Sequence, residues 1–272
     1  MLKVDYSNFD LDVYWKSIKR ETFLKPKSNS KNETLLDNKE KLFNEKRSSI
    51  SLESLYCFLQ KENEIFKKIF EEIELKDIIL LESDIFNTTV QDIEKKINSL
   101  TKDEQKRLTI ILKDIFQYSK FQGDILAPYF EKYLNPRTCY YCNIDFINVY
   151  DEESNENKFT LDHFIDKGRY PYLALSLFNL VPCCFVCNSK KIKGSIEFYE
   201  KPQLKNTNPY LKSFQFDEKV KFKLFLHKNC KDLNIKSKAD INIPLKENYS
   251  NEYDKYIEVF KLNERYVFVI LI

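Results

Sequence analysis

Cys139-Tyr-Tyr-Cys142 opens the stretch that decides the fold, and Cys184-Phe-Val-Cys187-Asn-Ser-Lys-Lys closes it. Each Cys-x-x-Cys pair can present two thiolates to one side of a tetrahedral ion, so the two pairs predict a structural zinc site. Ordinary zinc ribbons separate such pairs by roughly 15–20 residues. Here 41 residues separate them, and one of the two histidines of the chain, His163, lies in this insert. We therefore expect the zinc to hold an active site in place.

Cys183 makes the second pair ambiguous, because it directly precedes Cys184. Cys184 preserves the two-residue spacing of the first pair, so we expect Cys184 to be the ligand and Cys183 to be a small buried residue. The remaining residues of these types are expected to be structural: Cys57, Cys230 and His227. The predicted zinc ligands are Cys139, Cys142, Cys184 and Cys187.

The composition describes a soluble globular protein. The 272 residues can bury a full core, and 43% are hydrophobic and 32% charged. Three glycines with 22 Phe and 17 Tyr favour helices and aromatic packing over a turn-rich β sandwich. No signal-peptide region and no run of about 18 apolar residues is found. We expect a cytoplasmic protein with no membrane segment, whose reduced thiols favour metal ligation over disulfides.

The distribution of apolar and polar residues along the sequence divides the chain into four regions. Apolar residues recur at three- and four-residue steps over 51–73 and 92–100, and Thr101-Lys-Asp-Glu104 predicts a capping box that opens another helix. The expected domains are 1–50, an arm and linker; 51–135, a helical domain with a structural or partner-binding role; 136–200, the cysteine-containing core; and 201–272, a small mixed extension.

The core is expected to contain two strands followed by one helix. The first strand follows Cys142 and ends near Val149, and the second, Phe159–Phe164, delivers Asp162 and His163. The helix is expected from Cys184 to Gly194. Further expected elements are a polar loop at 151–158, a short helix at 171–177, strands at 221–226 and a helix at 253–260. The apolar residues 266–272 are expected to form a strand, or the stub of a segment whose packing partner lies elsewhere.

Asp162 and His163 are adjacent residues with complementary chemistry. A carboxylate suits Mg²⁺, and an imidazole can take a proton from water near neutral pH. Asn179 can accept the Nδ1–H of His163, or form a turn before Leu180-Val-Pro182. Asn188 follows the last cysteine of the second pair and can complete a metal shell or cap the turn. Each residue alone is a weak signal.

The ordered combination is more specific. Asp162-His163, then Asn179-Leu-Val-Pro, then Cys184-x-x-Cys-Asn-x-Lys-Lys resembles the zinc-containing branch of the HNH (ββα-metal) endonuclease superfamily. Within it, residues 161–182 are most similar to the nuclease subunits of Septu-type anti-phage systems. The resemblance covers about residues 136–200, extends loosely to 265, and barely includes the first 125 residues.

The resemblance implies a role for each matched residue. His163 is the general base, Asp162 and Asn188 hold one catalytic Mg²⁺ or Mn²⁺, and Asn179 orients the base. The four cysteines hold structural zinc. The implied fold class is α+β, with a mainly helical N-terminal region, a zinc-stabilised ββα-metal core and a mixed C-terminal extension.

The resemblance also implies a function and partners. It implies hydrolysis of phosphodiester bonds, with DNA as the first substrate to test, and a partner ATPase of the same defence system. Three basic residues are candidates for phosphate contact, or form an ordinary solvated surface: Arg169, Lys190 and Lys191. The net charge of +2 does not itself indicate nucleic acid.

Two other readings of the same residues stay open. One is a catalytically silent zinc-ribbon module that only binds nucleic acid or a partner. The joint presence of Asp162, His163 and Asn188 argues against it. The other is an RNA-cleaving toxin of the same fold, because catalytic residues do not report the substrate.

Overall fold

The computed structural model describes residues 2–20, 22–23, 50–147, 159–194, 196, 198–227, 241–248 and 250–270. The chain forms two compact units. The cysteine unit comprises Met1–Ser7, Leu134–Phe164 and Val181–Ile272, and the helical unit comprises Asn8–Tyr133 and Ile165–Leu180. This division differs from the contiguous domains expected from the sequence, because residues 165–180 belong with the helices.

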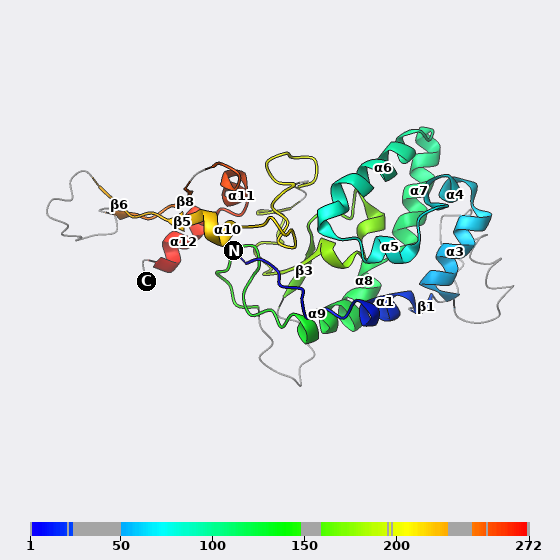
Figure 1. The fold of residues 1–272 in the computed structure, drawn as a ribbon, viewed down its shortest axis with the longest axis horizontal. Coiled ribbons are helices and arrows are strands. Elements are labelled where there is room, and N and C mark those ends of the chain that lie inside the picture. Colours follow the sequence, from blue (N-terminus) through cyan, green and yellow to red (C-terminus); the bar gives the residue numbers. More distant parts are fainter. Residues whose placement is uncertain are drawn as a thin grey trace. The chain divides into compact units, whose positions relative to one another are not determined.

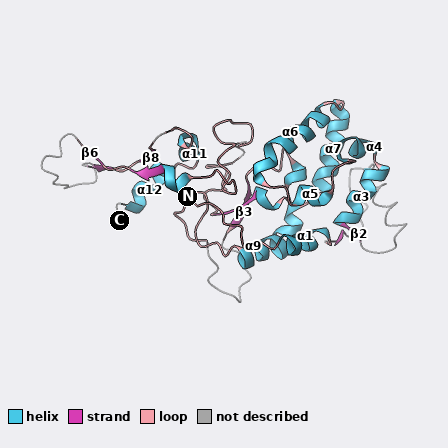
Figure 2. Ribbon diagram, in the orientation of Figure 1, coloured by secondary structure: helices cyan, strands magenta, loops and turns pink. Residues whose placement is uncertain are grey.

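The helical unit is built from short helices (Figures 1 and 2). They are α1 Leu11–Lys19, α3 Leu52–Glu62, α4 Glu64–Phe70, α5 Leu75–Ile79, α6 Phe86–Asn98, α7 Lys102–Ile115, α8 Tyr118–Phe121 and α9 Ala127–Tyr133, with a π-helical turn η2 at Gln122–Leu126 and 3-10 turns η1 Ser83–Ile85, η3 Pro171–Leu173 and η4 Leu177–Asn179. Strands β1 Thr22–Phe23 and β2 Ile50–Ser51 pair antiparallel. The helices expected over 51–73 and 92–100 are confirmed.

Side-chain caps explain where several helices begin. Asp10 and Ser51 accept from backbone amides in the first turns of α1 and α3. The predicted capping box is confirmed, because Thr101 Oγ1 accepts from the Glu104 amide and the Glu104 carboxylate accepts from the Thr101 amide. Such reciprocal caps satisfy amides that lack a partner within the helix.

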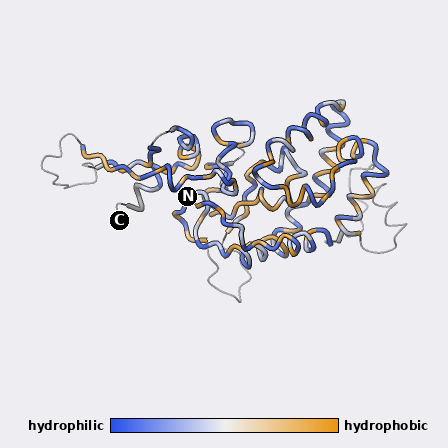
Figure 3. Tube along the Cα trace, viewed as in Figure 1, coloured by the Kyte–Doolittle hydropathy of each residue, from blue (hydrophilic) through white to orange (hydrophobic). Residues whose placement is uncertain are grey.

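Aromatic side chains fill the core of the helical unit. The rings of Tyr56 and Phe66 meet edge to face at 5.1 Å, and Phe70 meets Tyr172 in the same way at 6.1 Å. Figure 3 shows hydrophobic and hydrophilic residues interleaved along these helices, as expected of amphipathic elements. Tyr172 comes from the 165–180 segment, so this part of the insert completes the helical core.

Polar contacts also tie residues 165–180 into the helical unit. The Tyr172 hydroxyl lies 3.1 Å from Glu94 Oε1, and the buried Ser176 hydroxyl donates to the Ile78 carbonyl at 2.6 Å. The Tyr14 hydroxyl donates to the Leu175 carbonyl at 2.9 Å. Because these groups are buried, each bond satisfies an atom that would otherwise be costly to bury.

The cysteine unit has short two-stranded sheets and few helices. β3 Thr160–His163 pairs with β4 Leu180–Cys183. The other elements are α10 Phe216–Lys219, β5 Val220–Phe222 paired antiparallel with β8 Leu245–Glu247, β6 Phe225–Leu226 paired antiparallel with β7 Ile241–Asn242, α11 Asp254–Val259 and α12 Leu262–Ile270. The expected strand at 159–164, strands at 221–226 and helix at 253–260 are confirmed. The whole is a mixed α+β fold.

The helix expected from Cys184 to Gly194 is wrong, because this segment is a succession of turns. The Lys193 amide bonds to the Cys187 carbonyl and the Gly194 amide to the Ser189 carbonyl, and neither has the four-residue spacing of an α-helix. Gly194 has a φ of 52°, a left-handed conformation that glycine adopts readily. The polar loop predicted at 151–158 and the end of the first predicted strand, at 148–149, lie outside the described residues.

The strand expected at 266–272 is also wrong as far as Ile270, where α12 ends. Valine, phenylalanine and isoleucine favour strands, but tertiary contacts commonly override such propensities. Residues 271–272, residues 24–49 of the predicted arm and linker, and Cys230 lie outside the described residues. Within the described ranges, no helix has the length and apolar character needed to cross a membrane.

Candidate metal centre and active site

The four predicted cysteine ligands form one buried cluster. The Sγ atoms of Cys139, Cys142, Cys184 and Cys187 all lie within 4.8 Å of one another, and 4.0 Å separates those of Cys142 and Cys184. Sulfurs bound tetrahedrally at about 2.3 Å from zinc would be about 3.8 Å apart. The donor set and its spacing therefore fit a structural zinc ion, which would join the two Cys-x-x-Cys pairs.

Cys183 lies outside this cluster although it is also buried. Its Sγ lies 3.3 Å from Thr160 Oγ1, and burial raises the pKa of its thiol well above the ordinary value. A thiol that resists ionisation is a poor metal ligand. The structure thus places Cys184, and not Cys183, in the candidate zinc site.

The four clustered thiols behave as one interacting set. Hydrogen bonds from Cys139, Cys184 and Cys187 hold the pKa of Cys142 far below its usual range. The corresponding bonds with Cys139 and Cys142 raise the pKa of Cys187. Because ionising one thiol opposes ionising the next, four coexisting thiolates require a cation at their centre.

Both cysteine pairs are hydrogen-bonded to β3, the strand that carries Asp162 and His163. Tyr141, inside the first pair, donates its hydroxyl to Asp162 Oδ2 at 2.7 Å. Asn188, directly after the second pair, donates its side-chain amide to Thr160 Oγ1 at 3.0 Å. Burial and the Asp162 charge raise the pKa of Tyr141 well above 10, so its phenol remains a donor. The cluster therefore positions β3 from two sides.

Lys193 is a site residue that sequence reasoning missed. Its ammonium lies 2.9 and 3.1 Å from the two carboxylate oxygens of Asp162 and donates to the His163 carbonyl at 2.7 Å. It also lies over the Phe198 ring at 5.3 Å. Asp162 and Lys193 are both buried. The sequence marks Lys193 only as one of several lysines after the second pair, and no local spacing reveals a contact 31 residues away.

Replacing Lys193 by methionine is expected to destabilise the protein by about 3–5 kcal/mol, because it leaves the Asp162 carboxylate buried without its cation. Denaturant unfolding measures this change. Lys190→Met is the matched control, since Lys190 is exposed three residues earlier, and we expect it to change stability by less than about 0.5 kcal/mol. Equal unfolding free energies for the two variants would contradict the assigned ion pair.

Asn179 binds backbone in the segment that follows β3. Its amide oxygen accepts from the Ile165 amide at 2.7 Å, and its nitrogen donates to the carbonyls of Ile165 and Leu173 at 3.0 and 3.1 Å. The residue is fully buried. Through these bonds, Asn179 holds the backbone of the segment that follows His163. The sequence had suggested that its partner would be the His163 imidazole itself.

Asn179→Ala is expected to destabilise the protein by about 1–3 kcal/mol for each buried backbone group that it leaves unsatisfied. Chemical denaturation followed by circular dichroism measures the loss. The exposed Asn98, at the end of α6, provides the control substitution Asn98→Ala. A stability loss no larger than that of the control would show that the three bonds are not maintained in solution.

The predicted phosphate-contacting residues fall in different units. Lys190 and Lys191 are exposed in the turns that follow the second cysteine pair, in the cysteine unit. Arg169 is exposed in the helical unit, where its guanidinium lies over the Tyr170 ring at 5.5 Å. The two lysines therefore share a unit with Asp162 and His163, and Arg169 does not.

The predicted catalytic metal site at Asp162 and Asn188 does not fit a divalent ion as it is arranged. Carboxylate and amide oxygens are suitable ligands, but the Lys193 ammonium contacts both Asp162 oxygens and Tyr141 also binds Oδ2. Asp162 is only 6% exposed and His163 only 5%. A divalent ion at Asp162 would have to displace Lys193.

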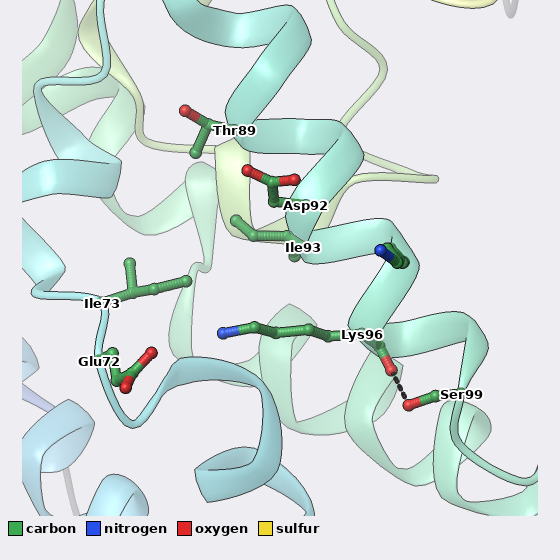
Figure 4. A pocket seen from close by; sticks show the side chains of 8 residues that line it. Glu72, Ile73, Thr89, Asp92, Ile93, Lys96 and Ser99 are labelled. Carbon is green, nitrogen blue, oxygen red and sulfur yellow. Dashed lines mark hydrogen bonds between the residues drawn. The ribbon is translucent and has the colours of Figure 1, made fainter.

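A pocket of about 650 Å³ opens on the helical unit (Figure 4). Its lining residues come from the segment after α4, from α6 and from the residue that follows α6: Glu72, Ile73, Thr89, Asp92, Ile93, Lys95, Lys96 and Ser99. The Ser99 hydroxyl caps the Lys96 carbonyl at 2.7 Å on its rim. None of the predicted catalytic residues lines this pocket.

Comparison with known proteins identifies no relative. No family model, no curated protein and no solved structure matches the chain.

Proposed function

We propose that the protein is a nuclease of the HNH type that hydrolyses phosphodiester bonds in nucleic acid. The observation that carries the proposal is the attachment of both cysteine pairs to β3 through Tyr141 and Asn188. A candidate zinc site thereby holds the strand bearing Asp162 and His163. A zinc ribbon without catalytic activity would not require Asp162 and His163 side by side at this position.

In the proposed reaction, His163 takes a proton from a water molecule that attacks the phosphorus. The new bond joins the water oxygen to phosphorus, and the bond from phosphorus to the 3′ oxygen breaks. The leaving 3′ oxygen takes a proton from solvent, giving a 5′-phosphate and a 3′-hydroxyl. Lys193 and Tyr141 fix the Asp162 carboxylate beside the base. Because His163 is buried, phosphate can reach its ring only when the surrounding chain moves.

The resemblance implies that bound Mg²⁺ or Mn²⁺ would neutralise charge on the phosphate and leaving group. The observed pairing of Asp162 with Lys193 supplies no open position for such an ion. We therefore assign no catalytic step to a metal, and treat metal dependence as a variable of the assay. The role in phage defence and an ATPase partner belong to the same proposal and rest on the resemblance alone.

A wild-type cleavage assay tests this function. Purified protein is incubated with plasmid DNA, single-stranded DNA and tRNA, each with Mg²⁺, with Mn²⁺ or with EDTA, and with and without the product of the neighbouring gene. We expect DNA cleavage under at least one of these metal conditions, and co-purification of a partner ATPase. Cleavage confined to tRNA would favour the toxin, and no cleavage under any condition would contradict the nuclease proposal.

A second candidate function is a binding module without catalysis, and the burial of Asp162 and His163 specifically favours it. Phe146 and Phe185, close to the two cysteine pairs in sequence, are 72% and 64% exposed and have the aromatic character that stacks on unpaired bases. Gel-shift binding to single-stranded nucleic acid, lost in Phe185→Ala and unaccompanied by cleavage, would identify this module.

A further inference from the structure

The C-terminal extension reaches the cysteine cluster through Arg265, a residue of α12. Its Nη1 lies 3.1 Å from Cys187 Sγ, and its Nη2 lies 3.4 Å from Cys142 Sγ. Nη2 also forms an ion pair with Asp145 Oδ2 at 2.9 Å. One guanidinium therefore contacts a sulfur of each Cys-x-x-Cys pair, and its side chain is only 17% exposed.

Two tyrosines of the same extension contact the first cysteine pair. The Tyr266 hydroxyl donates to the Cys142 carbonyl. The buried ring of Tyr256, on α11, meets the ring of Tyr141, inside that pair, at 6.3 Å. Both α11 and α12 therefore reach the residues that surround the cluster.

The negative charge of the site explains why a positively charged side chain is needed beside the cysteines. Zinc with four thiolates carries a net charge of about −2, and Asp145 Oδ2 lies only 3.9 Å from Cys142 Sγ. Arg265 Nη2 bonds to both of these groups. Without the guanidinium, a carboxylate and a thiolate would face each other in a partly buried site where their repulsion is poorly screened.

We propose that α11 and α12 form the outer shell of the zinc centre, and that Arg265 determines how firmly the zinc is held. Mutating a residue that hydrogen-bonds to a metal ligand commonly weakens metal affinity by about 10–100-fold. The C-terminal extension is then part of the metal site, although none of the four clustered cysteines lies in it. This inference depends only on the four-cysteine site and not on nuclease activity.

Zinc release to a chromophoric chelator tests the proposal on the full-length protein. We expect Arg265→Gln to release zinc about ten- to a hundredfold faster than the wild type. Lys255→Gln is the matched control, because it removes a positive charge from α11 that pairs with the exposed Glu258. Its release rate should stay within about twofold of the wild type. Release from Arg265→Gln at the wild-type rate would overturn the proposal.

A double variant separates charge from packing. In the Arg265→Gln background, Asp145→Asn removes the carboxylate that Arg265 had neutralised, so the charge account predicts slower release than from the single variant. Release from the double variant that is equally fast or faster would refute that account.

The proposal can also be tested on the wild-type protein, so that the result does not depend on whether a variant folds. Trypsin cleavage after Arg265, followed by mass spectrometry, should be slow in the zinc-loaded protein and at least about tenfold faster after chelation. Equal cleavage rates in the two states would mean that α12 does not depend on the metal centre.

Discussion

Cys184→Ser is expected to abolish zinc binding and unfold the cysteine unit, whereas Cys183→Ser should retain one zinc per chain. Only Cys184 lies in the four-sulfur cluster. Structural zinc contributes about 10–16 kcal/mol of apparent binding free energy in small zinc domains, so losing one of four ligands removes a large part of the stability of this unit. The two variants have the same amino-acid composition, because each replaces one of two adjacent cysteines by serine.

Metal analysis and thermal unfolding measure both outcomes. In Cys183→Ser, the serine hydroxyl can still bond to Thr160, whose Oγ1 already contacts the sulfur at this position. We therefore expect the free energy of unfolding to fall by only about 1 kcal/mol. Zinc loss in Cys183→Ser with retention in Cys184→Ser would show that the assigned ligand is wrong. Full zinc in both variants would exclude a four-cysteine site.

The features predicted correctly from the sequence are those set by local spacing. A Cys-x-x-Cys pair brings its own thiols together, and the Thr101 capping box depends on residues three positions apart. The strand bearing Asp162 and His163 was predicted from the short segment Phe159–Phe164. These signals need no knowledge of the rest of the fold.

The features missed are those set by distant partners. Lys193 meets Asp162 across 31 residues, and Arg265 meets Cys142 across 123. Residues 171–180 are mostly apolar, but periodicity alone cannot tell which core the segment 165–180 joins, and it joins the helical one. The predicted helix at 184–194 failed for a similar reason, because the cysteine cluster and the Lys193 contact impose turns on a lysine-rich segment.

His163→Ala is expected to reduce phosphodiester cleavage by about 10²–10⁴-fold, the usual contribution of a general base. Its zinc content should be unchanged, because the imidazole is not part of the four-cysteine cluster. The chain provides one matched control. His227, the other histidine, is exposed, and His227→Ala should cleave at the wild-type rate.

Cleavage by zinc-loaded wild type, His163→Ala and His227→Ala, compared on one substrate with added Mg²⁺ or Mn²⁺, therefore tests the central claim most directly. We predict that wild type and His227→Ala cut at equal rates and that His163→Ala, with its zinc intact, does not cut detectably. Equal cleavage by all three proteins, or no cleavage by any, would contradict a nuclease site built on His163.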